Sequence, residues 1–141
     1  MMKTRHADHG SGSALCRRAL GGTTAAMLAF ATGPSLAVEE KDFLLDTTAD
    51  LARLCGAAPE SPLYPAAIHL CQGYILGVHH FHEALAAGLQ EDIYCVDPTA
   101  ERSRNEVMAQ FAAWAAENPQ AGESEALDGL LQWAAVAFPC E

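Results

Sequence analysis

The segment AAIHLCQGYILGVHHFHEALAA, residues 66–87, decides the fold. Its apolar side chains recur at helical spacing and fall within one sector of a helix that turns by about 100° per residue. The positions in that sector are Ala67, Cys71, Tyr74, Ile75, Val78 and Leu85. The pattern predicts a long central helix over residues 66–87, which ends at Gly88.

A strip of small side chains lies beside this apolar sector and contains Gly73, Gly77 and Ala84. Each glycine inside a helix costs about 1 kcal/mol relative to alanine, so a compensating close contact is expected. We expect this contact to be internal packing against another helix. The alternative is a groove that accepts a partner helix, for example in a homodimer.

A short helix is predicted upstream of the central one. Thr47 and Asp50 have the spacing of a capping box, in which each side chain accepts a hydrogen bond from the other residue's backbone N–H. Gly56 can close that helix in the left-handed conformation. Residues 38–46 are expected to form a loose acidic arm, and the prolines within residues 57–65 mark a connection.

Two helices are predicted after the central one. Ser103 and Glu106 repeat the capping-box spacing, and the helix that they begin should end near Asn118, before a proline. Ser124 is expected to cap the last helix, whose core-facing positions should be Leu127, Leu130, Leu131, Ala134 and Phe138. No window alternates apolar and polar residues, so the fold class is all-α, a small bundle of about four helices.

The first 37 residues have the order of a secretory signal peptide. Four cations stand before an apolar stretch over residues 19–31, and small residues follow up to Ala37. That stretch is shorter than the ~20 residues that a membrane-spanning helix needs. We therefore expect cleavage after Ala37, export across the inner membrane, and a mature domain over residues 38–141; the route, general or twin-arginine, stays open.

The net charge argues against one class of partner, nucleic acid. The full chain of 141 residues has 8 Lys and Arg against 18 Asp and Glu. Removing residues 1–37 leaves 4 cations and 17 anions, a net charge of −13. Such a surface makes nucleic acid a poor partner.

Cleavage would also remove Cys16 and leave an even set of cysteines: Cys55, Cys71, Cys95 and Cys140. After export, an even set predicts two disulfides. Four cysteines allow three pairings, of which we favour the local one, Cys55 with Cys71 and Cys95 with Cys140. Zinc binding is the alternative, but no C-x-x-C spacing occurs, and we expect no metal and no other cofactor.

The run His79-His80-Phe81-His82-Glu83 offers a second candidate metal site. On a helix, His79 lies within reach of both His82 and Glu83, because residues three and four apart are neighbours. The competing interpretation, which we prefer, is one packed imidazole at His82 and two solvated ones.

No motif of a catalytic site is present in the mature chain. The G-x-S-x-G, H-E-x-x-H and Gly-rich phosphate-loop patterns are all absent. Two of the three serines are expected to be helix caps. We therefore predict a binding protein and no enzyme.

Several short motifs occur in a characteristic order along the mature chain. They are Asp46-Thr47-Thr48, Leu54-Cys55, Tyr64-Pro-Ala-Ala-Ile68, Cys71-Gln-Gly-Tyr-Ile-Leu-Gly77, Cys95 before a proline, Phe111-Ala-Ala-Trp114 and Pro139-Cys140. In these motifs the chain resembles the Rap/Tai immunity proteins, which are associated with type VI secretion. The resemblance covers nearly all of residues 38–141.

The resemblance implies a small helical periplasmic protein related in fold to the acid chaperone HdeA. It implies that the protein binds a cognate secreted peptidoglycan amidase and blocks its active site, which protects the producing cell. The alternative function is an HdeA-like acid-stress chaperone. The candidate partner-binding residues are acidic and aromatic loop positions: Tyr64, Glu91, Asp92, Tyr94 and Asp97.

Overall fold

The computed structural model describes residues 37–89 and 91–140, and these residues form four α-helices and two short 3₁₀ helices without any strand. The elements are η1 (Glu40–Leu44), α1 (Thr48–Cys55), α2 (Tyr64–Leu89), α3 (Arg104–Glu117), η2 (Ala121–Glu123) and α4 (Ala126–Ala137). The all-α prediction is confirmed. The expected signal peptide lies outside the described residues, apart from Ala37.

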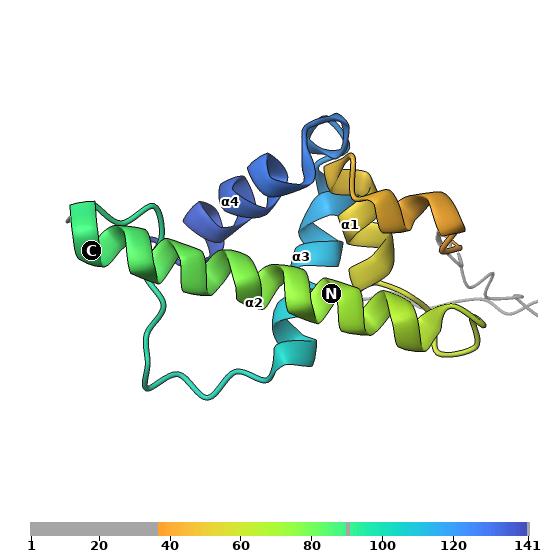
Figure 1. Ribbon diagram of the computed structural model, residues 1–141, viewed down its shortest axis with the longest axis horizontal. Helices are drawn as coiled ribbons and strands as arrows, with labels where there is room; N and C mark the ends of the chain where they lie inside the picture. Colours follow the sequence, from red (N-terminus) through yellow and green to blue (C-terminus); the bar gives the residue numbers. More distant parts are fainter. Residues whose placement is uncertain (1–36, 90, 141) are drawn as a thin grey trace, which may run out of the picture. The chain divides into compact units, whose positions relative to one another are not determined.

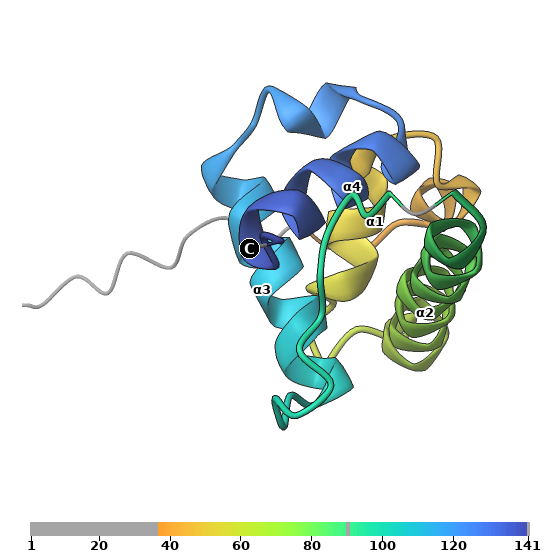
Figure 2. The same cartoon turned by 90° about the vertical axis from the view of Figure 1, so that its left-hand side faces the viewer.

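The short helix α1 lies at the centre of the described fold. It contacts the other three α-helices and both 3₁₀ helices, and Leu51 and Leu54 are fully buried there. Figure 2 shows α1 in yellow among α2, α3 and α4. The hydrophobic core therefore assembles around the smallest α-helix of the bundle.

Both predicted capping boxes are confirmed. The Thr47 hydroxyl accepts a hydrogen bond from the Asp50 N–H at 3.2 Å, and the Asp50 carboxylate accepts one from the Thr47 N–H at 2.9 Å. Ser103 and Glu106 make the same reciprocal pair, at 3.2 and 2.7 Å. These bonds satisfy backbone donors that a helix start leaves without partners.

The expectation that residues 38–46 form a loose arm is wrong. Most of this segment is the helix η1, in which the Asp42 side chain is fully buried. One Asp42 oxygen accepts from the Arg53 Nε–H at 2.9 Å, and the other accepts from the Glu39 N–H at 2.8 Å. The acidic segment is ordered because a cation on α1 neutralises its buried carboxylate.

The left-handed conformation that was predicted for Gly56 occurs instead at Leu45. Gly56 closes α1 with φ of −97°, whereas Leu45, after η1, has φ of 57°. A left-handed leucine is uncommon, because its side chain crowds the following carbonyl.

Helix α2 is longer at both ends than predicted. It begins at Tyr64, because Pro65 is tolerated in a first helical turn, and it continues through Gly88 to Leu89. The expected internal packing of the glycine strip is wrong, since a Cβ at Gly73 or Gly77 would meet nothing within 4 Å.

The predicted core face of α4 is confirmed at four of its five positions: Leu130 and Ala134 are buried, and Leu131 and Phe138 pack against the core. Gly129 and Trp133 are buried, whereas Leu127 is exposed. Ser124 does not cap the helix, since its hydroxyl donates to the carbonyl of Ala121 at 2.7 Å. Gly129 lets α4 approach α1 closely, since a Cβ there would lie 2.7 Å from the Cβ of Thr48.

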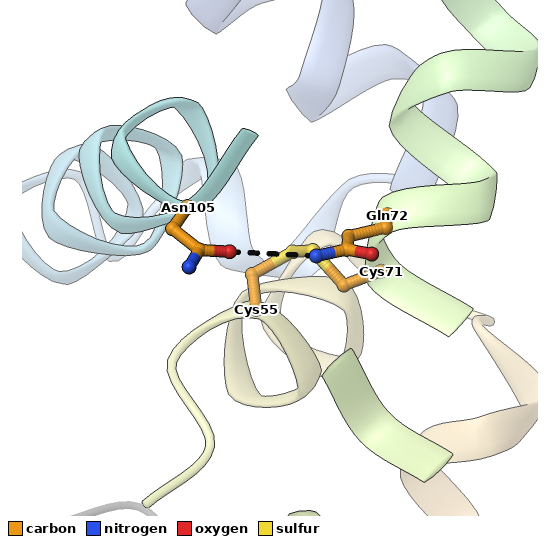
Figure 3. The surroundings of a disulfide bond; sticks show 4 residues. All are labelled: Cys55, Cys71, Gln72 and Asn105. Atoms are coloured by element: carbon orange, nitrogen blue, oxygen red, sulfur yellow. Dashed lines mark hydrogen bonds between the residues drawn. A yellow bond between two sulfur atoms is a disulfide. The ribbon is translucent and has the colours of Figure 1, made fainter. Parts of the chain in front are cut away.

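Two disulfides tie the bundle together in the predicted local pairing. Cys55, the last residue of α1, bonds to Cys71 of α2, and Cys95 bonds to Cys140 after α4. Figure 3 shows the first disulfide beside a 3.4 Å hydrogen bond from Gln72 on α2 to Asn105 on α3. Each bridge is expected to stabilise the fold by about 2–4 kcal/mol. No helix among the described residues is long and apolar enough to cross a membrane.

Candidate partner-binding site

The connection after α2 contains most of the predicted partner-binding residues. We call residues 91–97, Glu-Asp-Ile-Tyr-Cys-Val-Asp, the acidic loop. Its three carboxylates are exposed, and so are Ile93 at 54% and Val96 at 44%. The apolar pair supplies contact area and the carboxylates supply charge, so the loop is the candidate surface for a basic partner.

His82 on α2 anchors the middle of the acidic loop. Its Nε2 accepts a hydrogen bond from the Ile93 N–H at 3.0 Å, so the proton of the neutral ring must lie on Nδ1. The ring is buried and stacks on the Tyr94 ring at a centroid distance of 4.1 Å. The interpretation of His82 as a packed imidazole is confirmed.

Tyr94 was predicted as an aromatic loop residue that contacts a partner, but only 6% of it is accessible to solvent. Its hydroxyl lies 3.3 Å from Nδ1 of His79, and its ring packs between His82 and Phe138. Burial raises the pKa of the Tyr94 hydroxyl, and the nearby charge of Glu83 raises it further. In the free protein Tyr94 therefore anchors the loop to the bundle. The apolar side chains that the loop exposes are those of Ile93 and Val96.

A third anchor joins the acidic loop to the end of α4. The Cys95 N–H donates to the carbonyl of Phe138 at 2.8 Å, and the Cys95 side chain is bonded to Cys140. Figure 1 shows the chain leaving the C-terminal end of α2 and passing the end of α4 before it reaches α3. The loop is thus fixed to two helices within three consecutive residues.

Asp97 ends the acidic loop and organises the turn that follows it. One of its oxygens accepts from the Thr99 hydroxyl at 2.7 Å and from the Thr99 N–H at 2.8 Å. These hydrogen bonds lower the pKa of Asp97, and the charge of Arg102 adds to the effect. The carboxylate therefore stays ionised on an exposed surface.

Tyr64 is not brought together with the acidic loop. It lies at the first residue of α2, and the loop follows the last. At 1.5 Å per residue, the helix separates the two by roughly 35–40 Å. A partner would have to cover the length of α2 to contact both Tyr64 and Asp92.

The histidine run does not form a metal centre in the part of the chain that the structure describes. His79 Nε2 lies 3.7 Å from a Glu83 oxygen, but the Nε2 of His82 is already occupied by the Ile93 N–H. No group of three or more His, Cys, Asp or Glu side chains there is arranged to hold an ion.

An apolar stripe that the sequence analysis missed lies on the last turns of α2. Phe81 and Leu89 are about two-thirds exposed, and Leu85, which was expected in the core, is 42% exposed. Their spacing of four residues places them on one helix face, and this spacing was a usable signal. The stripe leads along α2 toward the acidic loop.

Comparison with known proteins identifies the chain through its family. The family model described as Rap1a immunity proteins matches residues 47–140, which include all four helices and both disulfides. No curated protein and no solved structure is detectably similar to the chain. The HdeA-like fold therefore stays a prediction.

Proposed function

The chain belongs to the Rap1a immunity protein family, and from this premise we propose that it binds and inhibits a type VI secreted peptidoglycan amidase in the periplasm. Membership makes it an immunity protein with a cognate effector as its partner. The amidase, the compartment and the contact surface are our proposal. Inhibition by binding also requires no catalytic group of its own.

The anchoring of the acidic loop is the observation that carries the proposal. A hydrogen bond to His82, the buried ring of Tyr94 and the Cys95–Cys140 disulfide hold this loop before any partner arrives. A loop that is already ordered loses less conformational entropy on binding, so more of the contact energy contributes to affinity.

The chemistry of the loop matches a partner with a basic, partly apolar surface. Glu91, Asp92 and Asp97 supply negative charge around the exposed Ile93 and Val96. Peptidoglycan hydrolases that bind anionic wall polymers through basic surfaces would be steered toward such a loop. Carboxylates that enter an active-site cleft would also exclude the substrate.

Export is supported by the order of the first residues and by the start of the fold. Val38, the first buried side chain among the described residues, directly follows the expected cleavage point at Ala37. Fractionation of cells that produce the full chain tests this part. We expect periplasmic protein whose mass corresponds to a start at Val38, and retention of residues 1–37 would contradict it.

The binding proposal is tested with the product of the neighbouring gene, which we expect to be a peptidoglycan amidase. We expect a nanomolar complex whose association rate falls as salt rises, together with loss of amidase activity. Reversing the loop charges in Glu91→Lys/Asp92→Lys should weaken binding at least tenfold, because both carboxylates are exposed in the acidic loop.

The double variant Glu117→Lys/Glu123→Lys is the matched control. Both residues are exposed and lie at the end of α3 and in η2, so the net charge changes equally while the loop is intact. Equal weakening by the two variants would show that only the overall charge matters. Failure of the unmodified protein to bind or inhibit the amidase would contradict the proposal itself.

An acid-stress chaperone is the second candidate, favoured by the cluster of Asp42, Asp50 and Arg53. Both carboxylates are buried beside one guanidinium, and the pKa of Asp50 is lowered in the folded protein, so protonating Asp50 at low pH removes a charge that stabilises α1. This function predicts suppression of client aggregation at about pH 2–3 with newly exposed apolar surface. If no apolar surface becomes accessible to a dye at that pH, the chaperone function is excluded.

A further inference from the structure

A pocket lies among α2, α3, α4 and the segment that precedes α3, and the acidic loop contributes Tyr94, Cys95, Val96 and Asp97 to its wall. Its volume is about 430 Å³, within the range of small-molecule sites. Its inner wall is apolar and contains Ile75, Val78, Met108, Leu130, Trp133 and Ala134. These side chains come from three helices, so the pocket is part of the packed bundle.

The pocket also holds an unusual share of the positive charge. Of the four cations in residues 38–140, Lys41 pairs with Glu39, and Arg53 pairs with Asp42 and Asp50. The other two are Arg102 and Arg104, and both line the pocket.

Neither of these two arginines forms an ion pair with any described residue. Arg102 instead holds its guanidinium 5.0 Å from the centre of the Phe138 ring, at the rim. Asp97 is the one carboxylate in the lining, and Thr99 already donates two hydrogen bonds to it. The rim therefore carries net positive charge on a protein that is strongly acidic elsewhere.

We propose that this pocket binds a single-chain amphipathic carboxylate, a fatty acid, with its alkyl chain in the apolar interior and its carboxylate at Arg102 and Arg104. Guanidinium groups pair with carboxylates in a bidentate geometry. Leu130 and Trp133 in the wall are only 2% and 4% exposed, which favours a flexible alkyl chain over a folded protein surface as the occupant. The inference does not depend on the identity of the effector.

The probes are chosen to separate the contribution of the head group from that of the chain. Dodecanoate, dodecyltrimethylammonium and butyrate are titrated into the full chain below their micellar concentrations. Calorimetry and tryptophan fluorescence report binding, the latter through Trp133 in the pocket wall, with Trp114→Phe as background because Trp114 does not line the pocket. We expect one dodecanoate per chain with a micromolar Kd, at least tenfold weaker binding of the cationic probe, and no saturable binding of butyrate.

The variants test the two arginines. Arg102→Gln/Arg104→Gln should weaken dodecanoate binding at least tenfold, because both charged partners of the head group are lost. Both side chains are exposed, so the fold should persist. Lys41→Gln removes one cation that does not line the pocket and pairs with Glu39, so it should leave the dodecanoate Kd unchanged.

Three outcomes would overturn the proposal. The first is equal affinity for the anionic and cationic probes, which would indicate detergent-like adsorption. The second is unchanged dodecanoate binding in the double arginine variant. The third is absence of saturable dodecanoate binding in a protein that still inhibits the amidase, which would exclude the pocket ligand without affecting the proposed function.

Discussion

Gly129 of α4 lies directly against Thr48 of α1, with no room for a side chain between the two helices. A Cβ at Gly129 would lie 2.7 Å from Thr48 Cβ and closer still to its Oγ1 and Cγ2. The Thr48 hydroxyl donates to the Glu125 carbonyl at 2.8 Å, and the Thr48 N–H donates to the Ser124 carbonyl at 2.8 Å. The start of α4 is thus hydrogen-bonded to the start of α1.

Gly129→Ala should therefore lower the free energy of unfolding by about 1–3 kcal/mol, the usual cost of overpacking a core. Gly77→Ala is the matched control, because its site is open and a helix gains about 1 kcal/mol from that exchange. Urea unfolding of the two variants measures both effects. If Gly129→Ala is as stable as the unmodified protein, the helices do not approach as described.

The ion pair between Asp42 and Arg53 predicts an asymmetric pair of variants. Arg53→Leu leaves the buried Asp42 carboxylate without a cation, which should cost about 3–5 kcal/mol. Asp42→Asn leaves Arg53 paired with Asp50 and should cost about 1–2 kcal/mol. Chemical denaturation at pH 7 distinguishes them, and equal losses would argue against a buried carboxylate at residue 42.

The two disulfides should differ in how readily they are reduced. Cys95 and Cys140 are exposed, whereas Cys55 and Cys71 are buried. A mild reductant should therefore open the Cys95–Cys140 bridge before the Cys55–Cys71 bridge. Mass mapping of alkylated cysteines over time measures the order. Because the exposed bridge anchors the acidic loop, its reduction should also weaken effector binding; simultaneous loss of both bridges would contradict this order.

Removal of each bridge gives a related expectation for stability. The bridged residues are separated by 16 positions for Cys55–Cys71 and by 45 for Cys95–Cys140. Loop-closure entropy then predicts losses of about 3 and about 4 kcal/mol for the double alanine variants. Thermal unfolding of both variants checks these values, and a larger loss for the Cys55/Cys71 variant than for the Cys95/Cys140 variant would contradict them.

Asp50 predicts how stability falls in acid. Burial is the largest single influence on the pKa of this carboxyl and raises it, but the hydrogen bonds from Thr47 and the charge of Arg53 together outweigh burial and lower it below 3.8. A depressed folded-state pKa means that the unfolded chain binds the proton more readily. The contribution of the ionised Asp50 to the free energy of unfolding is therefore present above about pH 4 and is lost as the pH falls through the folded-state pKa.

Asp50→Asn should remove part of this acid dependence. We expect the urea midpoint of the variant to change less between pH 5 and pH 3 than that of the unmodified protein, because an amide does not titrate. Asp46→Asn, at an exposed position before the helix, is the control and should keep the full slope. Identical slopes for all three proteins would show that Asp50 is not linked to acid unfolding.

The features predicted correctly depend on residues close together in the sequence. The capping boxes at Thr47 and Ser103 need only a partner three residues away, and the helical spacing around Cys71 identifies α2. The errors involve distant partners. Asp42 is buried because of Arg53, eleven positions later, and a segment without apolar periodicity offers no sign of that pairing.

The candidate site was predicted from the composition of its loop. The arrangement of its side chains was not, because that arrangement also depends on residues distant in the sequence. The sequence placed Glu91, Asp92 and Asp97 in a loop, where they are exposed, but the burial of Tyr94 depends on His82 and on the end of α4.

The core face of α4 was predicted except at Leu127, which is exposed, and at Gly129 and Trp133, which are buried. Local spacing therefore finds the helices and most of their core faces, while a close contact such as that of Gly129 with Thr48 needs the assembled core.

The bond between Cys95 and Cys140 has a practical consequence for anyone producing the protein. Any affinity handle appended beyond residue 141 would emerge beside Cys95, in the middle of the acidic loop. Immobilising the protein through that end on a sensor chip would mask the surface being measured, and a false negative would result. The handle belongs elsewhere, for instance in the proline-containing connection between α1 and α2.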